Sequence, residues 1–199
     1  MRIRCLLAAL AITAVLCVPI QAQDERHEVA VSYGAVPNTV WIDIYSDLIP
    51  ASMGMEYDNG HYVGPIGLEY FYHTSPLVGV GAVAVFATNN EDGFYNNVKG
   101  LHINRSYLTF MPSVKLNWLR KANWGFYSKL AAGVTYAHLS AENYDDNGKV
   151  DDKVTEKDLL FNYQASLIGF EAGSDRVRAF TELGIGEQGV ALAGLRVRF

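Results

Sequence analysis

The sequence predicts an all-β fold, a closed antiparallel barrel of eight up-and-down strands that spans a membrane. Three observations lead to this prediction. Apolar side chains recur at every second position in several segments, short and long connections alternate between the segments, and the final alternating segment ends on the aromatic residue Phe199. A strand has a side-chain period of two, and a membrane-spanning strand needs about 9–11 residues.

The N-terminal segment has the layout of a secretory signal peptide. Arg2 and Arg4 precede an apolar stretch from Cys5 to Ile20, and Ala22 offers a small residue for cleavage. An uncleaved membrane anchor is the alternative, but the stretch is shorter than the ~20 residues that a spanning helix needs. We therefore expect a signal peptide at residues 1–22 and a barrel domain at residues 23–199.

The composition excludes several classes of protein. With 16 basic and 21 acidic residues the net charge is −5, which argues against a nucleic-acid partner. Both cysteines, Cys5 and Cys17, lie in the predicted signal peptide, so the mature chain is expected to form no disulfide. After that signal no apolar run approaches 18 residues, which excludes a helical membrane protein.

Eight segments show the alternation of a strand. The clearest places Leu108, Phe110 and Val114 on one face and Thr109, Ser113 and Lys115 on the other. The third segment is apolar and glycine-rich on both faces, so its orientation stays open. The predicted strands are residues 28–34, 63–73, 78–88, 107–118, 125–137, 159–170, 176–186 and 189–199.

The connections predict which end of the barrel faces outward. Residues 73–77, 120–124 and 173–175 are short turns, whereas residues 35–62, 89–105 and 142–158 form long polar connections. Outer-membrane barrels place short turns in the periplasm and long loops outside. The last connection, residues 186–188, is short and departs from this pattern.

The first long loop is expected to contain a short helix. Apolar residues recur at helical spacing from Val40 to Ile49, Asn38 or Thr39 can cap its start, and Pro50 ends it. Such a helix either packs over the barrel mouth or acts as a lid or recognition element.

With these strands and loops, residues 28–199 resemble the small eight-stranded outer-membrane barrels of the OmpA/OmpX type. The resemblance implies a monomeric protein of the Gram-negative cell envelope, located in the cell outer membrane. It says little about activity, because one fold carries many functions; since the sequence contains no clear catalytic motif, we expect a non-enzymatic structural or surface-interaction role. Its implied partners are outer-membrane lipid, the barrel-assembly machinery acting through Phe199, and an extracellular surface partner.

The two faces of the strands have separate expected roles. Val197, Leu195 and Ala193 should contact lipid, whereas Arg196 and Arg198 should point inward. Buried charges must be paired, so Glu182 and Glu28 are the expected partners of these arginines. Eight strands leave an interior that side chains just fill, which predicts a plugged lumen. The inward-facing charged residues are Glu69, Lys115, Lys129, Arg178, Glu182, Arg196 and Arg198.

Two rival functions remain open. The first is a barrel that admits a small apolar ligand under the helix expected in the first long loop, with a pocket lined by residues such as Phe71, Met111, Tyr127 and Phe180. The second is a lipid A-modifying deacylase, because the His138-Leu139-Ser140 segment resembles the His-x-Ser pair of PagL-type enzymes. A histidine base needs an orienting acid, which would have to be Asp152 or Glu156.

The acidic connection also resembles a calcium-binding loop. Residues 143–151 carry oxygen side chains at alternating positions and Gly148 at the sixth, but Val154 replaces the glutamate of position twelve. An acidic, solvated hairpin tip explains the same residues. No catalytic, cofactor or metal site is therefore predicted.

Overall fold

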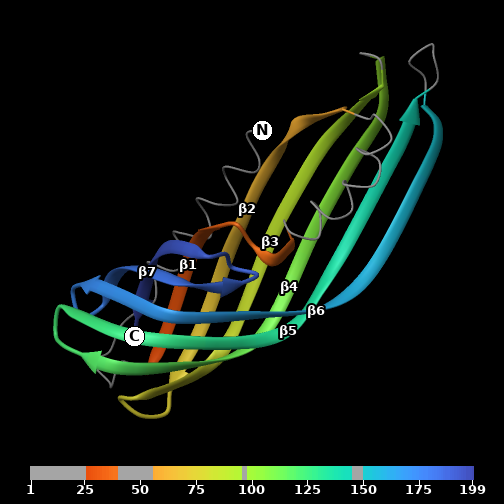
Figure 1. The fold of residues 1–199 in the computed structure, drawn as a ribbon. Coiled ribbons are helices and arrows are strands. Elements are labelled where there is room, and N and C mark those ends of the chain that lie inside the picture. The colour runs from red at the N-terminus through yellow and green to blue at the C-terminus, as the bar shows by residue number, and fades with distance from the viewer. Residues whose placement is uncertain (1–25, 40–55, 96–97, 145–149) are drawn as a thin grey trace.

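A computed structural model describes residues 26–39, 56–95, 98–144 and 150–199. In these residues eight antiparallel strands form a closed barrel in sequence order, and β8 pairs with β1 to close it (Figure 1). This confirms the predicted up-and-down barrel. The strands are β1 (His27–Ala35), β2 (Glu56–His73), β3 (Val78–Tyr95), β4 (Val98–Arg120), β5 (Trp124–Tyr144), β6 (Val150–Gly173), β7 (Val177–Gly186) and β8 (Ala191–Arg198).

Two predicted segments lie outside the described residues. They are the signal peptide at 1–22 and the helix expected from Val40 to Ile49. Within the part of the chain that the structure describes, no helix has the length and apolar character needed to cross a membrane.

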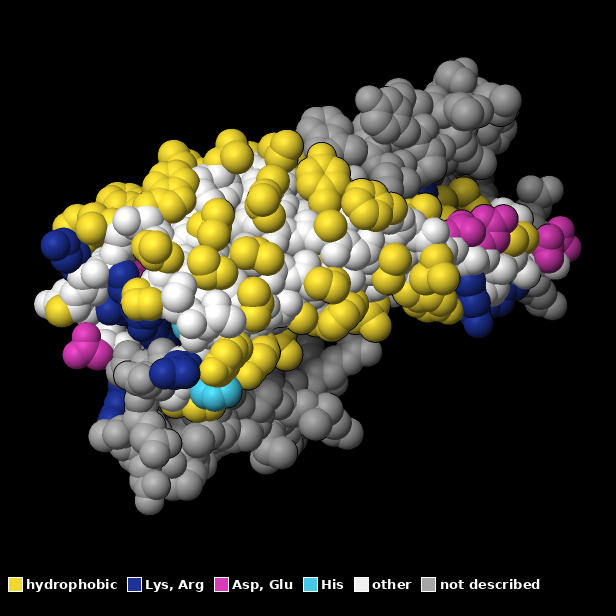
Figure 2. All heavy atoms as spheres, turned by 90° about the horizontal axis from the view of Figure 1, so that it is seen from below, with side chains coloured by type: hydrophobic (Ala, Val, Ile, Leu, Met, Phe, Trp, Pro, Cys, Tyr) yellow, Lys and Arg dark blue, Asp and Glu magenta, His cyan; other side chains and the backbone are white. Residues whose placement is uncertain are grey.

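The alternation of side chains decides which face each strand turns outward. On β4, Leu108 and Phe110 are exposed while Thr109 and Met111 are buried. The orientation of β3, left open by its sequence, is settled in the same way, because Val83 and its inward-facing neighbours are buried. On the face of the barrel seen in Figure 2, hydrophobic side chains consequently cover the surface, and charged groups gather towards the ends.

Strands β2 to β6 continue well beyond the ends of β1 and β7 (Figure 1). The last residue of β1 that pairs with β2 is Tyr33, opposite Ile66, and the last residue of β7 that pairs with β6 is Gly186, opposite Gln164. We call the extension the distal sheet. It comprises residues 56–63 of β2, 88–95 of β3, 98–106 of β4, 138–144 of β5 and 150–157 of β6.

The distal sheet corrects all three predicted long loops in part, and residues 56–62 of the first loop belong to β2. Residues 89–105 and 142–158 are largely paired strand, with Asn89 opposite Arg105 and Asn143 opposite Asp152. The prediction was wrong because it required apolar alternation. Backbone pairing between strands does not need an apolar face when both faces meet water.

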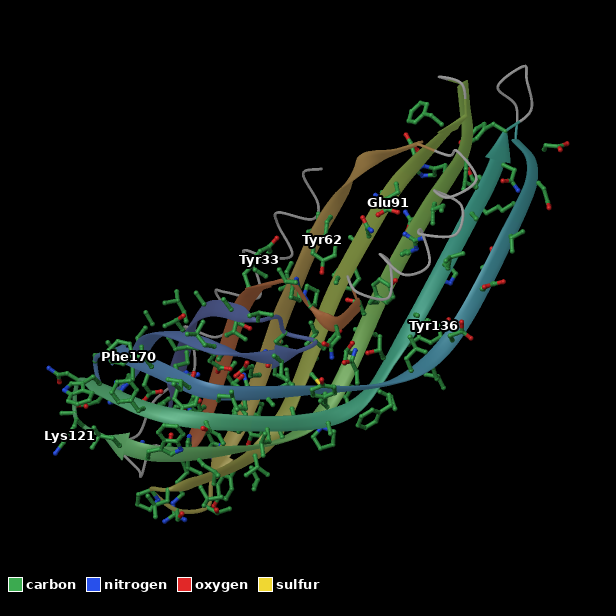
Figure 3. All side chains as sticks on the ribbon, viewed as in Figure 1. Tyr33, Tyr62, Glu91, Lys121, Tyr136 and Phe170 are labelled. Atoms are coloured by element: carbon green, nitrogen blue, oxygen red, sulfur yellow. The ribbon has the colours of Figure 1, made fainter. Side chains whose placement is uncertain are left out.

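The short turns lie at the opposite end of the barrel. They connect β2 to β3, β4 to β5 and β6 to β7, as predicted, and Figure 3 shows Lys121 at this end and Glu91 in the distal sheet. The β7–β8 turn lies at the distal end of the barrel, since Glu187 N–H donates to the Tyr163 carbonyl and Val190 N–H to the Ala35 carbonyl.

Candidate functional site

The barrel interior is filled by a network of ionised side chains. All of them are buried, and most are almost completely inaccessible to solvent. The predicted inward direction of the charged positions is confirmed. The network consists of Glu28 on β1, Glu69 on β2, Lys115 on β4, Lys129 on β5, Glu171 on β6, Arg178 and Glu182 on β7, and Arg196 and Arg198 on β8.

Two carboxylates organise the half of the network nearer the short turns. Glu28 accepts from Lys115 Nζ at 2.7 Å and from Arg198 Nε at 3.0 Å. Glu171 accepts from Arg196 at 2.6 Å and from Arg198 at 2.6 Å. Each carboxylate therefore meets more than one cation, which offsets the cost of removing these charges from water.

Arg178 links Glu171 to the end of the barrel. Its Nη1 donates to Glu171 at 2.9 Å, and its Nη2 donates to the backbone carbonyls of Lys121 at 3.1 Å and Ala122 at 2.6 Å. One guanidinium thus ties β7 to the β4–β5 turn. Its planar fork of donors reaches a carboxylate and two carbonyls at the same time, an arrangement that suits a guanidinium better than the compact ammonium of a lysine.

A second cluster lies nearer the distal end. Lys129 Nζ donates to Glu69 at 2.6 Å and lies 2.8 Å from the Glu182 carboxylate. Gln188, from the β7–β8 turn, donates to Glu69 at 2.7 Å. Ser166 donates to Glu182. A single ammonium therefore joins carboxylates from two distant strands.

Tyr127 connects the two clusters. Its hydroxyl donates to Glu182 and accepts from Arg196 Nη2, both at 2.7 Å. Its ring lies 4.2 Å from Lys115 Nζ and 4.6 Å from the Arg196 guanidinium carbon, distances of cation–π contacts. Gly169 on β6 lies against this ring, and a side chain there would collide with it.

The predicted partners of the β8 arginines are partly confirmed. Glu28 contacts both Arg198 and Arg196, the latter at 3.4 Å, whereas Glu182 reaches Arg196 at 3.8 Å. Sequence reasoning missed Glu171. A β-bulge between Ser166 and Ile168 shifts the register, so Leu167 and Ile168 both face outward and the positions that follow change face.

The residues proposed to line a ligand pocket instead take part in packing. Phe71 and Met111 belong to one apolar cluster with Val83, and Tyr127 and Phe180 belong to another. Arg196 lies over the Phe180 ring at 4.0 Å. The four side chains predicted to line a pocket therefore pack inside the barrel and fill its lumen.

Polar side chains occupy the distal mouth of the barrel. Glu187 in the β7–β8 turn accepts from Asn162 Nδ2 at 2.8 Å and from the Thr39 hydroxyl at 3.3 Å. Asn38 donates to Asn162 at 3.0 Å. Asn38 and Thr39, expected to cap a helix, thus connect the chain after β1 to β6 and to the β7–β8 turn.

The register places the predicted acids on the wrong face for a catalytic triad. His138 lies opposite Lys157, and Ser140 lies opposite Thr155, whereas Glu156 is opposite Leu139. Residues directly opposite in an antiparallel pair share a face, and neighbours along a strand alternate. Glu156 therefore lies on the other side of the sheet from His138, and Asp152, opposite Asn143, does too.

The calcium-like segment is described at its edges alone. Tyr144 pairs with Val150, and residues 145–149, which include Gly148, lie outside the described residues. Among the described side chains no group of three or more histidine, cysteine, aspartate or glutamate residues has the geometry of a metal site.

No family model matches the chain, and no curated protein matches it. Among solved structures, the crystal structure of Ail, the attachment invasion locus protein of Yersinia pestis, is similar to this chain. The TM-score is 0.45 and the identity 11%, over 87% of this chain and 97% of that chain. The strand order of the chain itself shows the fold, eight antiparallel strands in a closed ring, which is the architecture implied by the resemblance to the OmpA/OmpX type.

Proposed function

We propose that the protein is an integral outer-membrane β-barrel without enzymatic activity, and that its distal sheet makes contacts at the cell surface. The main support for a membrane barrel is the polarity of the two faces of its strands. The outward face of the barrel is apolar, and the inward face carries the ion-pair network. A barrel dissolved in water has the opposite arrangement.

The dimensions of the apolar surface support a membrane location. On β4 the outward apolar row runs from Leu108 to Trp118, which matches the ~9–11 residues of a membrane-spanning strand. Soluble monomers rarely expose a contiguous apolar patch above a few hundred Å². Closure between β1 and β8 also removes the unpaired strand edges that lipid cannot solvate.

The interior supports a structural role over transport. Side chains such as Tyr127, Arg196 and Lys115 occupy the centre of the lumen and contact one another. A filled lumen does not serve as a diffusion pore. The packed aromatic side chains and the register around His138 likewise give less support to ligand binding or lipid A deacylation.

The distal sheet supports the surface role because it projects beyond the apolar outer surface of the barrel, which we call the apolar belt and which on β4 runs from Leu108 to Trp118. Its β6 edge carries Asp152, Lys153, Glu156 and Lys157, all exposed. Charges along an edge strand discourage pairing with another strand. We therefore assign surface contacts to the faces of this sheet and its hairpin ends.

Cell fractionation tests the location. The full-length protein should be found in the outer-membrane fraction and should migrate differently on a gel before and after boiling, since closed barrels resist unfolding by detergent. Recovery in the soluble periplasmic fraction, with one mobility in both samples, would contradict the proposal.

Shortening one hairpin tests the surface role. Residues 143–152 are replaced by Asn-Gly, a two-residue turn that keeps Glu142 opposite Lys153. The variant should keep the mobility shift on boiling and lose adhesion of expressing cells to polystyrene and to one another. Unchanged adhesion by a correctly inserted variant would exclude this hairpin as the contact site.

A further inference from the structure

The outward face of β5 and β6 changes abruptly from apolar to basic. On β6, Phe161 and Leu159 are 76% and 73% exposed, and the next outward residue is Lys157. On β5, Tyr136 is followed on the same face by His138. The apolar row of each strand therefore ends directly against a basic side chain.

These two basic residues lie opposite each other. His138 pairs with Lys157 across the β5–β6 ladder, which places their Cβ atoms about 4.5–5.5 Å apart. Basic groups in such a position repel each other when both are charged. An anion held between them would remove this repulsion.

In the part of the chain that the structure describes, no carboxylate lies on this face within one rung of these two basic residues. Among the described residues, the outward positions on the same rung and on the adjacent rungs of β4, β5 and β6 are apolar, hydroxyl or amide side chains. The next lysine along β6 differs, because Lys153 donates to Glu142 at 2.7 Å. Those outward neighbours are Asn104, Ser106, Leu108, Tyr136, Ser140, Thr155 and Leu159.

The surroundings favour a phosphate over a simple counter-ion. Ser106, Ser140 and Thr155 supply hydroxyl donors beside the two basic groups. Below them, Leu159 and Phe161 offer apolar surface on a stretch of β6 that β7, which ends opposite Gln164, does not border. A ligand with a phosphate and acyl chains would satisfy both halves of this surface.

We infer that the outward face of β5 and β6 binds the phosphate of an acylated lipid of the outer leaflet through Lys157 and His138, with its acyl chains against Leu159 and Phe161. This inference rests on the proposed membrane location. It gives the His138-Leu139-Ser140 segment a binding role in place of a catalytic one. Cationic side chains near a membrane surface contribute about 1 kcal/mol each to binding an anionic lipid.

Native mass spectrometry of the detergent-purified barrel tests the inference. The probes are lipid A bearing both phosphates, the same lipid after phosphatase treatment, and inorganic phosphate. The wild-type protein should retain phosphorylated lipid A most tightly. Loss of the Lys157 charge alone should weaken binding about fivefold, so the Lys157→Gln/His138→Gln variant should bind it at least about fivefold more weakly. Lys153→Gln is the matched control, because that ammonium is already paired, and it should change the affinity less than twofold.

Three results would overturn the inference: equal binding of phosphatase-treated lipid A, an unchanged affinity of the double variant, or equal weakening by Lys153→Gln. Retention of inorganic phosphate as tightly as lipid A would replace the lipid site with a general anion site. The mobility shift on boiling is measured in parallel. If the mobility shift is present and lipid A is not retained, the inferred lipid-binding site is contradicted while the proposed membrane barrel is still supported.

Discussion

The barrel and the distal sheet are built from the same strands but differ in what their side chains meet. On β4, Val114 faces outward and Lys115 inward within the barrel, whereas Asn104 and Arg105 occupy the corresponding directions in the distal sheet. Backbone pairing continues through both regions. Backbone pairing therefore sets the length of the strands, whereas the apolar outward row marks the part of the barrel that we propose contacts lipid.

The two regions also contain ion pairs of equal length in different surroundings. Lys115 and Glu28 approach to 2.7 Å with both side chains fully buried. Lys153 and Glu142 also approach to 2.7 Å, but both are accessible to water. Solvent screens the second pair, so we expect ion pairs to determine stability in the barrel and to matter little in the distal sheet.

The largest effect is expected from removing one buried cation. Arg196→Met leaves Glu171 and Glu28 without one of their cations, and should lower the free energy of unfolding by about 3–5 kcal/mol. Urea unfolding in lipid vesicles, followed by tryptophan fluorescence, measures the change. Lys153→Gln in the distal sheet is the comparison and should have little effect. Similar losses in both variants would remove the distinction between the regions.

A charge placed on the outward face should come next in size. Val114→Arg puts a guanidinium in the apolar belt and should cost about 2–4 kcal/mol of folding free energy. Asn104→Arg lies on the same strand and face but in the distal sheet, and should change stability by less than about 0.5 kcal/mol. The same unfolding assay applies. If Val114→Arg were harmless, the belt would not face lipid.

Amide hydrogen exchange should separate the regions without any substitution. Backbone amides of β5 near Lys129 lie between the filled lumen and the face that we propose contacts lipid, whereas those near Ser140 belong to the distal sheet. Opening of the distal strands should therefore be frequent compared with opening of the barrel strands. Uniform protection along β5 would show that the two regions unfold as one unit.

The smallest effect is expected from acid. The hydrogen bond from Lys153, followed by its charge, lowers the pKa of Glu142 below its ordinary value of 4.5. Pairing of Glu142 therefore stabilises the distal hairpin above the unfolded pKa, and this contribution is lost as pH falls through the lowered pKa. Exchange of the Glu142 and Lys153 amides between pH 3 and 7 measures it, with Glu142→Gln as the variant in which this dependence should disappear.

The regions that could be predicted from the sequence are those in which outward apolar and inward polar side chains alternate without interruption. In the barrel an apolar outward face and a packed inward face enforce alternation, so all eight strands and the inward position of Lys115 and Arg196 were predictable. Glu171 was missed because the predicted strand ended at residue 170, and because a bulge after Ser166, for which the alternation gives no signal, changes the face of the residues that follow. The distal sheet was missed because water on both faces removes the alternation itself.

The central claim is that the outward side chains of β4 meet lipid in the barrel and water in the distal sheet. Because Cys5 and Cys17 lie in the predicted signal peptide, single cysteines can be introduced at Phe110, Val114 and Asn104 and spin-labelled in the vesicle-inserted protein. Electron paramagnetic resonance then compares collision with oxygen, which concentrates in lipid, and with a water-soluble nickel chelate. The account predicts that oxygen dominates at Phe110 and Val114 and that nickel dominates at Asn104. Preferential collision with nickel at all three positions would contradict it.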